Sequence, residues 1–385
     1  MGGGSDHTAK LAALEGEGGD PEQVLKDYFH NTPTADIIGD IAIKDTLGHG
    51  TYGRVRLCES AGARDALERV QLAHTGFFAL KILKKSEIIR LKQGEHVQSE
   101  RQLLLHKTSH PFIVQAYHTY KDERNLFMIL EYVPGGELLS DARNCFDNDT
   151  AKFYAAQLVM ALQYLHADNI IYRGLVPDNL LIDRSGYIKL VDFGFAKQLH
   201  ATTAGEGPLT YTLCGTAEYL APEIVNSQGH SKGADWWALG IVIYEMLAGY
   251  PPFYANNPFE IYQQILRAQP RYPLHFDLNL HEGINIADGA RLRDQPRNGL
   301  VARLLISDRK GRIGCLKNGA EDIKKHKWFR GLNWAQLYNK QMAAPMTPDL
   351  ASDADTRYYA NYPDSVEESG PLLTPQKQKM FDFWC

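Results

Sequence analysis

A glycine-rich stretch at residues 47–55 has the composition of a loop that binds phosphate through its backbone. It reads G-x-G-x-x-G-x-V, with Gly48, Gly50 and Gly53 at the spaced positions. Backbone N–H groups approach an anion closely only where no Cβ stands in the way, which is the freedom that glycine provides. Dinucleotide-binding turns share this spacing but lead into a helix, whereas residues 54–57 continue as a strand pattern. We expect a hairpin over phosphate groups; a glycine-rich hairpin without a ligand is the alternative.

Two further segments carry side chains suited to charge chemistry. Lys81 stands within the apolar run 77–83, where an unpaired charge would be costly; a position on the surface is the alternative. Farther along, two short apolar runs flank a Ser-Gly turn and predict a β-hairpin over residues 180–191. Asn179 precedes this hairpin and Asp192 follows it.

The elements that must position these residues follow from capping and periodicity. A short helix is expected over residues 21–30, because an aspartate N-cap and a proline open it. The sequence becomes strand-like from Ile41, and residues 126–133 read as a buried strand. Residues 150–166 carry apolar side chains at helical spacing and predict a buried helix. Residues 1–20 are small, polar and glycine-rich, and we expect a disordered leader there.

Composition places the chain among ordinary globular proteins. Its 385 residues, 44% hydrophobic and 23% charged, could form two or three domains or one two-lobed unit. A net charge of −5 argues against general nucleic-acid binding. The five cysteines are far apart and without metal-ligand spacing, which predicts reduced thiols in a cytosolic protein. No secretory signal pattern begins the chain, and the apolar run 238–249 is too short to span a bilayer. We expect a cytoplasmic location, with the nucleus as a second compartment.

Taken in order, these motifs resemble the protein kinases of the AGC group, and most of all the cAMP-dependent type. The resemblance covers about residues 41–385. It rests on the glycine-rich hairpin, the lysine strand, the loop 172–179, the Asp-Phe-Gly at 192–194, the Ala-Pro-Glu at 221–223, the helix at 235–240 and an aromatic C-terminal motif.

The resemblance implies an α+β, bilobal fold. One lobe would be a small antiparallel sheet with one main helix, and the other would be larger and mainly helical. The implied organisation is a flexible leader and short helix at 1–40, a kinase domain at 41–329 and an AGC-type tail at 330–385. Within the kinase domain, Glu223 and Arg312 would form a structural ion pair.

The resemblance also implies a site for ATP with Mg²⁺. Lys81 would bind phosphate and pair with Glu100, while Asn179 and Asp192 would hold the metal ion. The implied nucleotide-binding positions are Leu47, Gly48, Gly50, Gly53, Val55, Ala79, Lys81, Glu131, Val133 and Leu181.

The chain departs from the family pattern at the centre of its catalytic loop. The family has an aspartate base and a lysine there, and this sequence has Gly174 and Val176. A general base contributes about 10²–10⁴ in rate, and the lysine stabilises charge on the transferred phosphoryl group. We therefore expect at least about a thousandfold loss from typical kinase turnover. Rescue by the nearby Asp178 is the less favoured outcome, and so is a sequencing artefact, because two positions differ.

Two functions remain open at this point. The first is a nucleotide-binding pseudokinase that acts by docking. The second is an active or weakly active serine/threonine kinase that transfers the ATP γ-phosphate to arginine-rich substrates. Residues 174 and 176 favour the first.

Two surfaces are further implied by the resemblance. Glu137, Asp178 and Glu245 match acids that receive arginines of a substrate or pseudosubstrate, so a protein or peptide rich in arginine is the expected partner. A cAMP-binding regulatory subunit is the natural candidate, and no nucleic acid is expected. The second surface is an activation phosphosite, at which Thr210 would be phosphorylated and received by Arg173, Lys197 and His96. The chain also carries insertions at 58–75 and 201–209 relative to the family, and a second expected phosphosite at Thr374.

Overall fold

The computed structural model describes residues 20–50, 52–70, 76–140, 145–200, 208–273, 299–362 and 371–384. The chain divides into two compact units. Unit 1 comprises Met1–Lys107, Gln115–Pro134 and Asp349–Cys385, and unit 2 comprises Thr108–Val114 and Gly135–Pro348. The expected leader (1–19 of it) and most of the insertion at 201–209 (201–207) lie outside the described residues.

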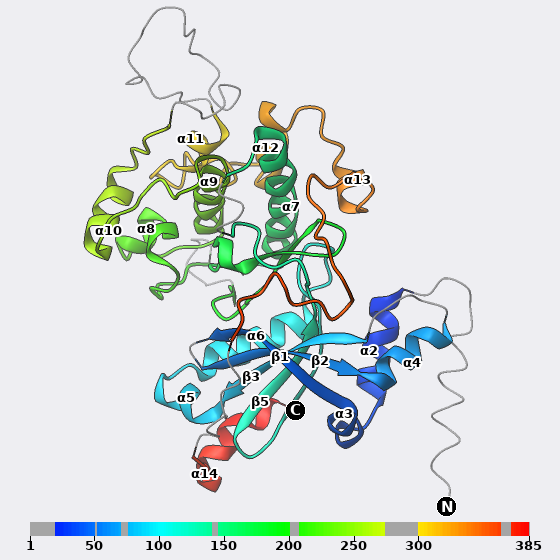
Figure 1. Cartoon of the computed structure of the whole chain (residues 1–385). Helices are drawn as coiled ribbons and strands as arrows, with labels where there is room; N and C mark the ends of the chain where they lie inside the picture. Colours follow the sequence, from blue (N-terminus) through cyan, green and yellow to red (C-terminus); the bar gives the residue numbers. More distant parts are fainter. Residues whose placement is uncertain are drawn as a thin grey trace, which may run out of the picture. The chain divides into compact units, whose positions relative to one another are not determined.

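Unit 1 is built on a five-stranded antiparallel sheet of order β1-β2-β3-β5-β4 (Figure 1). Its elements are α2 (Pro21–Asn31), α3 (Thr34–Asp40), β1 (Ile41–Gly50), β2 (Gly53–Ser60), α4 (Ala61–Arg69), β3 (Phe77–Lys84), α5 (Lys85–Arg90), α6 (Gly94–His106), β4 (Ala116–Lys121), β5 (Asn125–Glu131), α14 (Pro375–Gln378) and the 3-10 helix η8 (Lys379–Trp384).

The first helix forms as its capping residues predict. Asp20 caps α2 by accepting a hydrogen bond from the Glu22 backbone nitrogen, and proline follows at the first helical position. The helix buries Val24, Leu25 and Phe29 against the sheet residue Phe78. The prediction of a helix at 21–30 is confirmed.

The charged insertion after β2 contains a helix, α4, that the sequence analysis did not identify. Ser60 caps it by accepting from the Ala63 nitrogen at 3.1 Å. Its buried residues, Ala63, Ala66 and Leu67, follow the i, i+3, i+4 spacing of one helix face. That face packs against α2, and the two helices lie side by side (Figure 1). The insertion is therefore part of the core of unit 1.

The C-terminal segment completes unit 1. Trp384 is fully buried, and its indole nitrogen donates to the Tyr120 carbonyl at 2.8 Å. The Trp384 carbonyl accepts from Arg101 Nε and from Thr119 Oγ1, each at 2.9 Å. Lys85, only 2% exposed, donates to Gln378 at 2.7 Å. The segment from α14 to η8 is therefore held by hydrogen bonds as well as by apolar contact.

Unit 2 is mainly helical. Its elements are α7 (Asn148–Ala167), β6 (Ile170–Ile171), η3 (Pro177–Asn179), β7 (Leu180–Ile182), β8 (Ile188–Leu190), β9 (Lys197–Gln198), η4 (Ala217–Tyr219), α8 (Pro222–Val225), α9 (Gly233–Ala248), α10 (Pro258–Arg267), α11 (Leu300–Leu304), α12 (Ala320–Lys324), η7 (Lys327–Phe329) and α13 (Trp334–Tyr338). The apolar helix α9 packs against α7 and α11. The predicted α+β class, with one antiparallel-sheet unit and one helical unit, is confirmed.

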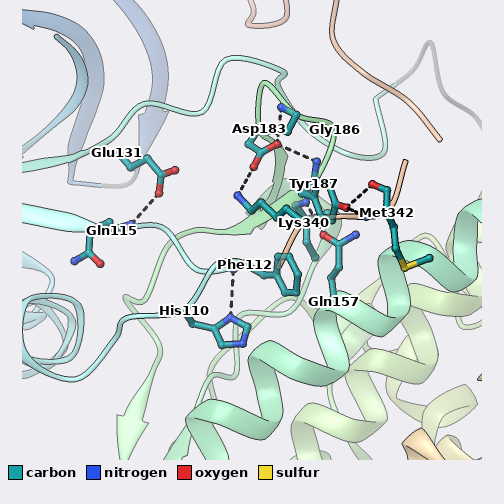
Figure 2. Close-up of polar contacts among 12 residues, drawn as sticks. His110, Phe112, Gln115, Glu131, Gln157, Asp183, Gly186, Tyr187, Lys340 and Met342 are labelled. Atoms are coloured by element: carbon teal, nitrogen blue, oxygen red, sulfur yellow. Dashed lines mark hydrogen bonds and ion pairs between the residues drawn. The ribbon is translucent and has the colours of Figure 1, made fainter. Parts of the chain in front are cut away.

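The predicted hairpin is β7–β8, and Asp183 fixes its turn. The Asp183 carboxylate accepts from the backbone nitrogens of Ser185 and Tyr187, at 2.8 and 2.9 Å, and from Lys340 at 2.7 Å (Figure 2). Gly186 takes φ = +83°, a value that favours glycine. Because the turn is anchored, the residues just before β7 and just after β8 are held in place.

Within the described ranges, we find no helix long and apolar enough to cross a membrane.

Candidate functional site

The phosphate-binding lysine expected from the sequence is paired inside unit 1. Lys81 lies on β3 opposite Val55 and Met128. Its Nζ is 2.6 Å from Oε1 of Glu100, which is buried on α6. The costly unpaired charge in an apolar strand is thus avoided.

The glycine-rich stretch forms the β1–β2 hairpin, in which Gly50 pairs with Gly53. A Cβ on Gly53 would stand 1.8 Å from the Ile82 carbonyl oxygen, so glycine there serves the sheet. Around Gly48, by contrast, no described atom lies within 4 Å of the Cβ position, and the nearest to that of Gly50 is at 3.9 Å. The hairpin therefore leaves its backbone open to an approaching group at these two glycines.

Three of the expected nucleotide-binding positions share one apolar cluster in unit 1. Leu47, Val55 and Ala79 pack together with Tyr132 and with Tyr359 of the C-terminal segment. The Tyr359 hydroxyl donates to the Val133 carbonyl. The contribution of Tyr132 to this cluster was not foreseen from the sequence, because no local pattern shows which side chains pack around the residue that directly follows β5.

Glu131, another expected nucleotide-binding residue, has a structural contact inside unit 1. Its carboxylate accepts from the backbone nitrogen of Gln115 at 3.2 Å, as Figure 2 shows. The remaining expected nucleotide residue, Leu181, lies on β7 in unit 2 and is partly buried.

Gly174, Asn179 and Asp192 come together in unit 2. The Asn179 side-chain nitrogen donates to the Gly174 carbonyl oxygen at 2.8 Å. Asp192 has φ = +55°, and its exposed carboxylate accepts from the Gly194 nitrogen at 3.1 Å. A Cβ on Gly174 would stand 3.5 Å from both the Asn179 nitrogen and the Asp192 carbonyl oxygen. The two expected metal ligands therefore flank the position where the family carries its base.

Asn179 and Asp192 suit a magnesium ion better than a metal whose ligands all come from the protein. In the described parts of the chain there is no group of three or more His, Cys, Asp or Glu residues that could hold a metal. Magnesium is usually held by one or two protein oxygens together with substrate phosphates and water. Since the Asn179 side-chain nitrogen donates to the Gly174 carbonyl, the side-chain oxygen is the atom of Asn179 that would bind a cation. These residues fit the ion that the family uses.

Val176, at the second altered position, has an apolar side chain. It is 8% exposed and extended, with φ = −137° and ψ = 157°, just before η3. Its side chain lines a cavity of about 20 Å³ together with Cys214 and Tyr219. The loop therefore presents neither a proton acceptor at 174 nor a cation at 176.

The expected docking acids separate into an exposed pair and a half-buried member. Glu137 and Asp178 are exposed, and the backbone of Glu137 forms an isolated antiparallel β-bridge with that of Leu181. Glu245 accepts a hydrogen bond from the Tyr219 hydroxyl. Burial raises the pKa of Glu245, and the negative charges of Asp178 and Glu218 raise it further, while the Tyr219 hydrogen bond acts in the opposite direction.

This electrostatic coupling places Asp178 and Glu245 in one acidic region and adds a residue to it. Glu218 was missed by the sequence analysis, although it lies only a few residues ahead of the Ala-Pro-Glu motif. Its charge could be read from the sequence; its proximity to Glu245 could not, because α9 brings them together from 27 positions apart.

The expected phosphosite residue is itself buried in unit 2, although the three residues after it are exposed. Thr210 is 4% exposed, and Lys197 Nζ donates to its hydroxyl at 3.2 Å. Arg173 is 9% exposed, has φ = +59° and donates from Nε to the Phe195 carbonyl at 2.8 Å. His96 lies on α6 in unit 1, where Nδ1 is 2.6 Å from Gln93 Oε1. Two residues after Thr210, Thr212 is exposed.

A buried ion pair supports the helical unit. Arg312, fully buried, donates to both carboxylate oxygens of Glu223, at 2.7 and 2.9 Å. Its guanidinium also lies 5.2 Å from the centre of the Trp237 ring. This is the pairing expected from the sequence, and its role is structural.

Comparison with known proteins gives consistent matches. The protein kinase domain family matches residues 41–329. The chain is 44% identical over 334 residues to the human cAMP-dependent protein kinase catalytic subunit PRKX, covering 86% of this chain and 83% of that protein. It is 45% identical over 329 residues to the cAMP-dependent protein kinase catalytic subunit 3 of Drosophila melanogaster, covering 85% of this chain and 50% of that protein. With the cAMP-dependent protein kinase catalytic subunit of Dictyostelium discoideum, identity is 43% over 343 residues, covering 88% of this chain and 47% of that protein.

Proposed function

Because the chain belongs to the protein kinase domain family, we propose that it is a cAMP-dependent-kinase-like protein that binds ATP with Mg²⁺ but is impaired in phosphoryl transfer. The observation that carries the proposal is the pair Gly174 and Val176, which leaves an otherwise ordered loop without an ionisable side chain at either position. Its biological action would then depend on docking.

Retention of nucleotide binding is supported by residues in both units. Unit 1 supplies the Lys81–Glu100 pair and the open backbone at Gly48 and Gly50. Unit 2 supplies Asn179 and Asp192. When bound, Mg²⁺ would neutralise charge on the ATP phosphates, and Lys81 would orient them.

Impairment of transfer follows from what the two altered residues cannot do. Glycine at 174 can neither orient a substrate hydroxyl nor accept its proton, which is worth about 10²–10⁴ in rate. Valine at 176 cannot stabilise charge on the transferred group. Because the two missing groups act on one transition state, their losses are not simply multiplied.

Docking of basic peptides is supported by the acidic region of unit 2. The exposed carboxylate of Asp178 and the half-buried Glu245 influence each other electrostatically. Arginine pairs bidentately with carboxylates, so arginine-containing segments should be preferred over lysine-containing ones. A pseudosubstrate segment of a regulatory subunit is the partner we propose.

The proposed phosphosite lies in the segment 208–214. The sequence resemblance predicts Thr210 as the modified residue, and the hydrogen bond that Lys197 donates to its hydroxyl supports this prediction. Its burial means that the segment must open before an upstream kinase can reach it, whereas Thr212 is already exposed. Intact-mass analysis of Thr210→Ala and Thr212→Ala variants, produced with an upstream kinase, identifies the residue that is modified.

The central experiment is a phosphate-transfer assay on an arginine-rich peptide, run beside a Mg-ATP thermal-shift measurement on the same preparation. We expect a clear thermal shift together with transfer at least about a thousandfold below typical kinase turnover. Transfer at about 1–100 s⁻¹, the usual kinase range, would show that the protein is an active serine/threonine kinase.

A further inference from the structure

His230 lies directly beside the proposed phosphosite. Thr210 and His230 form an antiparallel bridge in which the Thr210 nitrogen donates to His230 at 3.0 Å and the His230 nitrogen donates back at 2.9 Å. Residues that exchange both backbone hydrogen bonds project their side chains to the same face of the pair. The imidazole of His230 is therefore a neighbour of the Thr210 side chain, to which Lys197 already donates.

Two buried side-chain nitrogens at this place have no hydrogen-bond partner among the described residues. Arg173 Nη1 and His230 Nε2 are both inaccessible to solvent and make no hydrogen bond. His230 as a whole is 1% exposed. Buried polar atoms without partners are rare and costly, so each calls for an explanation such as an absent ligand. We call Arg173, Lys197 and His230 the basic cluster.

The carboxylates near the basic cluster are engaged elsewhere. Asp235 accepts from His166 Nε2 at 2.7 Å and from the backbone nitrogens of Tyr172 and Arg173, at 2.9 and 2.8 Å. Glu223 is held by both terminal nitrogens of Arg312. Neither acid reaches the two unpartnered donors. The cluster thus has positive charge and N–H donors in excess of its anionic partners.

We infer that His230, together with Arg173 and Lys197, binds the phosphoryl group of a phosphothreonine in the segment 208–214, and that His230 does so in its protonated form. The inference rests on the proposed phosphosite and adds to it a residue that the sequence analysis did not assign. A phosphoryl group has three strong acceptor oxygens and a charge of about −1.5 to −2 near neutral pH, which matches three donors and their excess charge.

The electrostatics of the unmodified protein agree with this assignment. Burial, together with the positive charges of Arg173 and Lys197, lowers the pKa of His230 to about 4, while Asp235 and Glu223 act in the opposite direction. A neighbouring phosphoryl group favours the charged imidazolium and so raises this pKa. By linkage, protonation of His230 must strengthen the hold on the phosphoryl group equally, so the modified segment is held more firmly as the pH falls toward 6.

The test measures the pKa of His230 directly in the full chain. Phosphothreonine is introduced genetically at position 210 and, in a separate sample, at position 212. The histidine rings are labelled with ¹⁵N and followed by NMR from pH 5 to 8, and a His230→Gln variant assigns the resonance. We expect the pKa of His230 to rise by about 1–3 in at least one phosphorylated sample. No ATP or transfer step is involved, so the outcome is independent of the nucleotide proposal.

His118 supplies the matched control. It is a second histidine with an inaccessible, unpartnered Nε2 among the described residues and a lowered pKa, but it lies on β4 in unit 1. Besides burial, the charges that lower its pKa are those of Arg101 and His30 and none of the basic cluster, so we expect no response to phosphothreonine at 210 or 212. As a second readout, the melting-temperature gain caused by phosphorylation should grow from pH 8 to pH 6 in the wild type and stay flat in His230→Gln.

Two results would overturn the inference. One is a His230 pKa that is the same in the unmodified protein and in both phosphorylated samples. The other is a rise produced by inorganic phosphate alone but by neither phosphothreonine, which would make the cluster a site for a free anion.

Discussion

The side-chain nitrogen of Asn179 donates a 2.8 Å hydrogen bond to the backbone carbonyl of Gly174. This contact closes the loop that would carry the catalytic base, although no base is there. A Cβ added at Gly174 would meet the Tyr172 ring at 3.3 Å and two further atoms at 3.5 Å. The backbone at 174 is not left-handed, so a side chain requires only a shift of a few tenths of an ångström. The loop has thus lost a functional group while keeping the shape that would present it.

Restoring both altered residues should therefore restore transfer. We expect Gly174→Asp together with Val176→Lys to raise the transfer rate on an arginine-rich peptide by about 10²–10⁴. Gly174→Asp alone should recover only part of this rate increase. Val176→Lys alone should do little, because the lysine stabilises charge on the phosphoryl group while no residue orients the substrate hydroxyl. The double variant should exceed the product of the singles, as coupled residues do. The measurement is single-turnover phosphate transfer.

The control for repair adds Asp192→Ala to the double variant, which should abolish the recovered rate by removing a metal ligand. A wild type already as fast as the double variant would mean that another group acts as the base. An inactive double variant would mean that a change elsewhere, such as the insertion at 201–209, blocks transfer independently.

Mg-ATP should stabilise the fold. A ligand at about 100 times its dissociation constant contributes roughly 2.7 kcal/mol to the free energy of unfolding, which is visible as a rise in melting temperature. Lys81→Met should remove most of this rise, because Lys81 is the side chain placed for phosphate. Lys84→Met, on the same strand, should leave it intact. If millimolar Mg-ATP gives no rise in the wild type, the nucleotide proposal is wrong.

Arginine-rich peptide binding should depend on the acidic region and on pH. We expect Asp178→Asn and Glu245→Gln each to weaken binding several-fold by calorimetry, while Asp149→Asn, an exposed acid on α7, should not. Because the pKa of Glu245 is raised, this carboxyl loses its charge at a higher pH than an ordinary glutamate does. Affinity should therefore fall on acidification earlier in the wild type than in Glu245→Gln. Equal binding of the peptide and its alanine analogue would contradict the proposal.

His110 should make the free energy of unfolding pH-dependent. Its Nδ1 accepts from the Phe112 nitrogen at 3.2 Å, which requires the neutral ring (Figure 2). Burial, with a smaller effect of Lys189, lowers its pKa to about 4. A lowered pKa contributes stability that is present above the unfolded value of about 6.5 and is lost as the pH falls toward 4.

The loss from His110 can reach about 3 kcal/mol over that interval. His110→Asn keeps an acceptor without the titration, so its urea midpoint should decline less between pH 7 and pH 5. The exposed His106 gives the control, since His106→Asn should follow the wild type. A decline in His110→Asn as steep as in the wild type would exclude His110 as the cause.

Substitution of one partner in the buried pair Glu223–Arg312 should strongly destabilise the fold. Removing one partner leaves an uncompensated buried charge, so Arg312→Ala should cost about 3–5 kcal/mol. Chemical denaturation followed by circular dichroism measures the cost. Lys310→Ala, two residues earlier and exposed, should stay close to the wild type. A small effect of Arg312→Ala would mean that Glu223 becomes protonated or hydrated in the variant.

The elements that sequence predicted best are those whose own residues carry the signal. The helix at 21–30 has its cap and proline, and the hairpin at 180–191 has its Ser-Gly turn. The sequence analysis did not predict helix α4, although Ser60 and the spacing of Ala63, Ala66 and Leu67 mark it, because the high charge of the insertion is equally typical of a solvent-exposed loop. Local pattern can reveal such a helix when the cap is sought first.

The residue types of the site could be predicted from the sequence, but the surroundings of each residue could not. Lys81 and Glu100 could be named, yet the burial of Thr210 and the coupling of Glu218 to Glu245 could not. Burial and proximity depend on which distant segments pack together. The lack of a partner at His230 Nε2 could not be predicted either. Nothing in the residues next to His230 in the sequence indicates that it faces a threonine 20 positions away.

The position of Trp384 has a consequence for how the protein is made. Unit 1 begins near the N-terminus, but its core includes a tryptophan that the ribosome adds after unit 2 has been completely translated. The early strands therefore leave the ribosome without one of the side chains they enclose, and unit 2 has all its residues first. We therefore expect the core of unit 1 to be completed only after unit 2 has been synthesised, although most of unit 1 precedes unit 2 in the sequence.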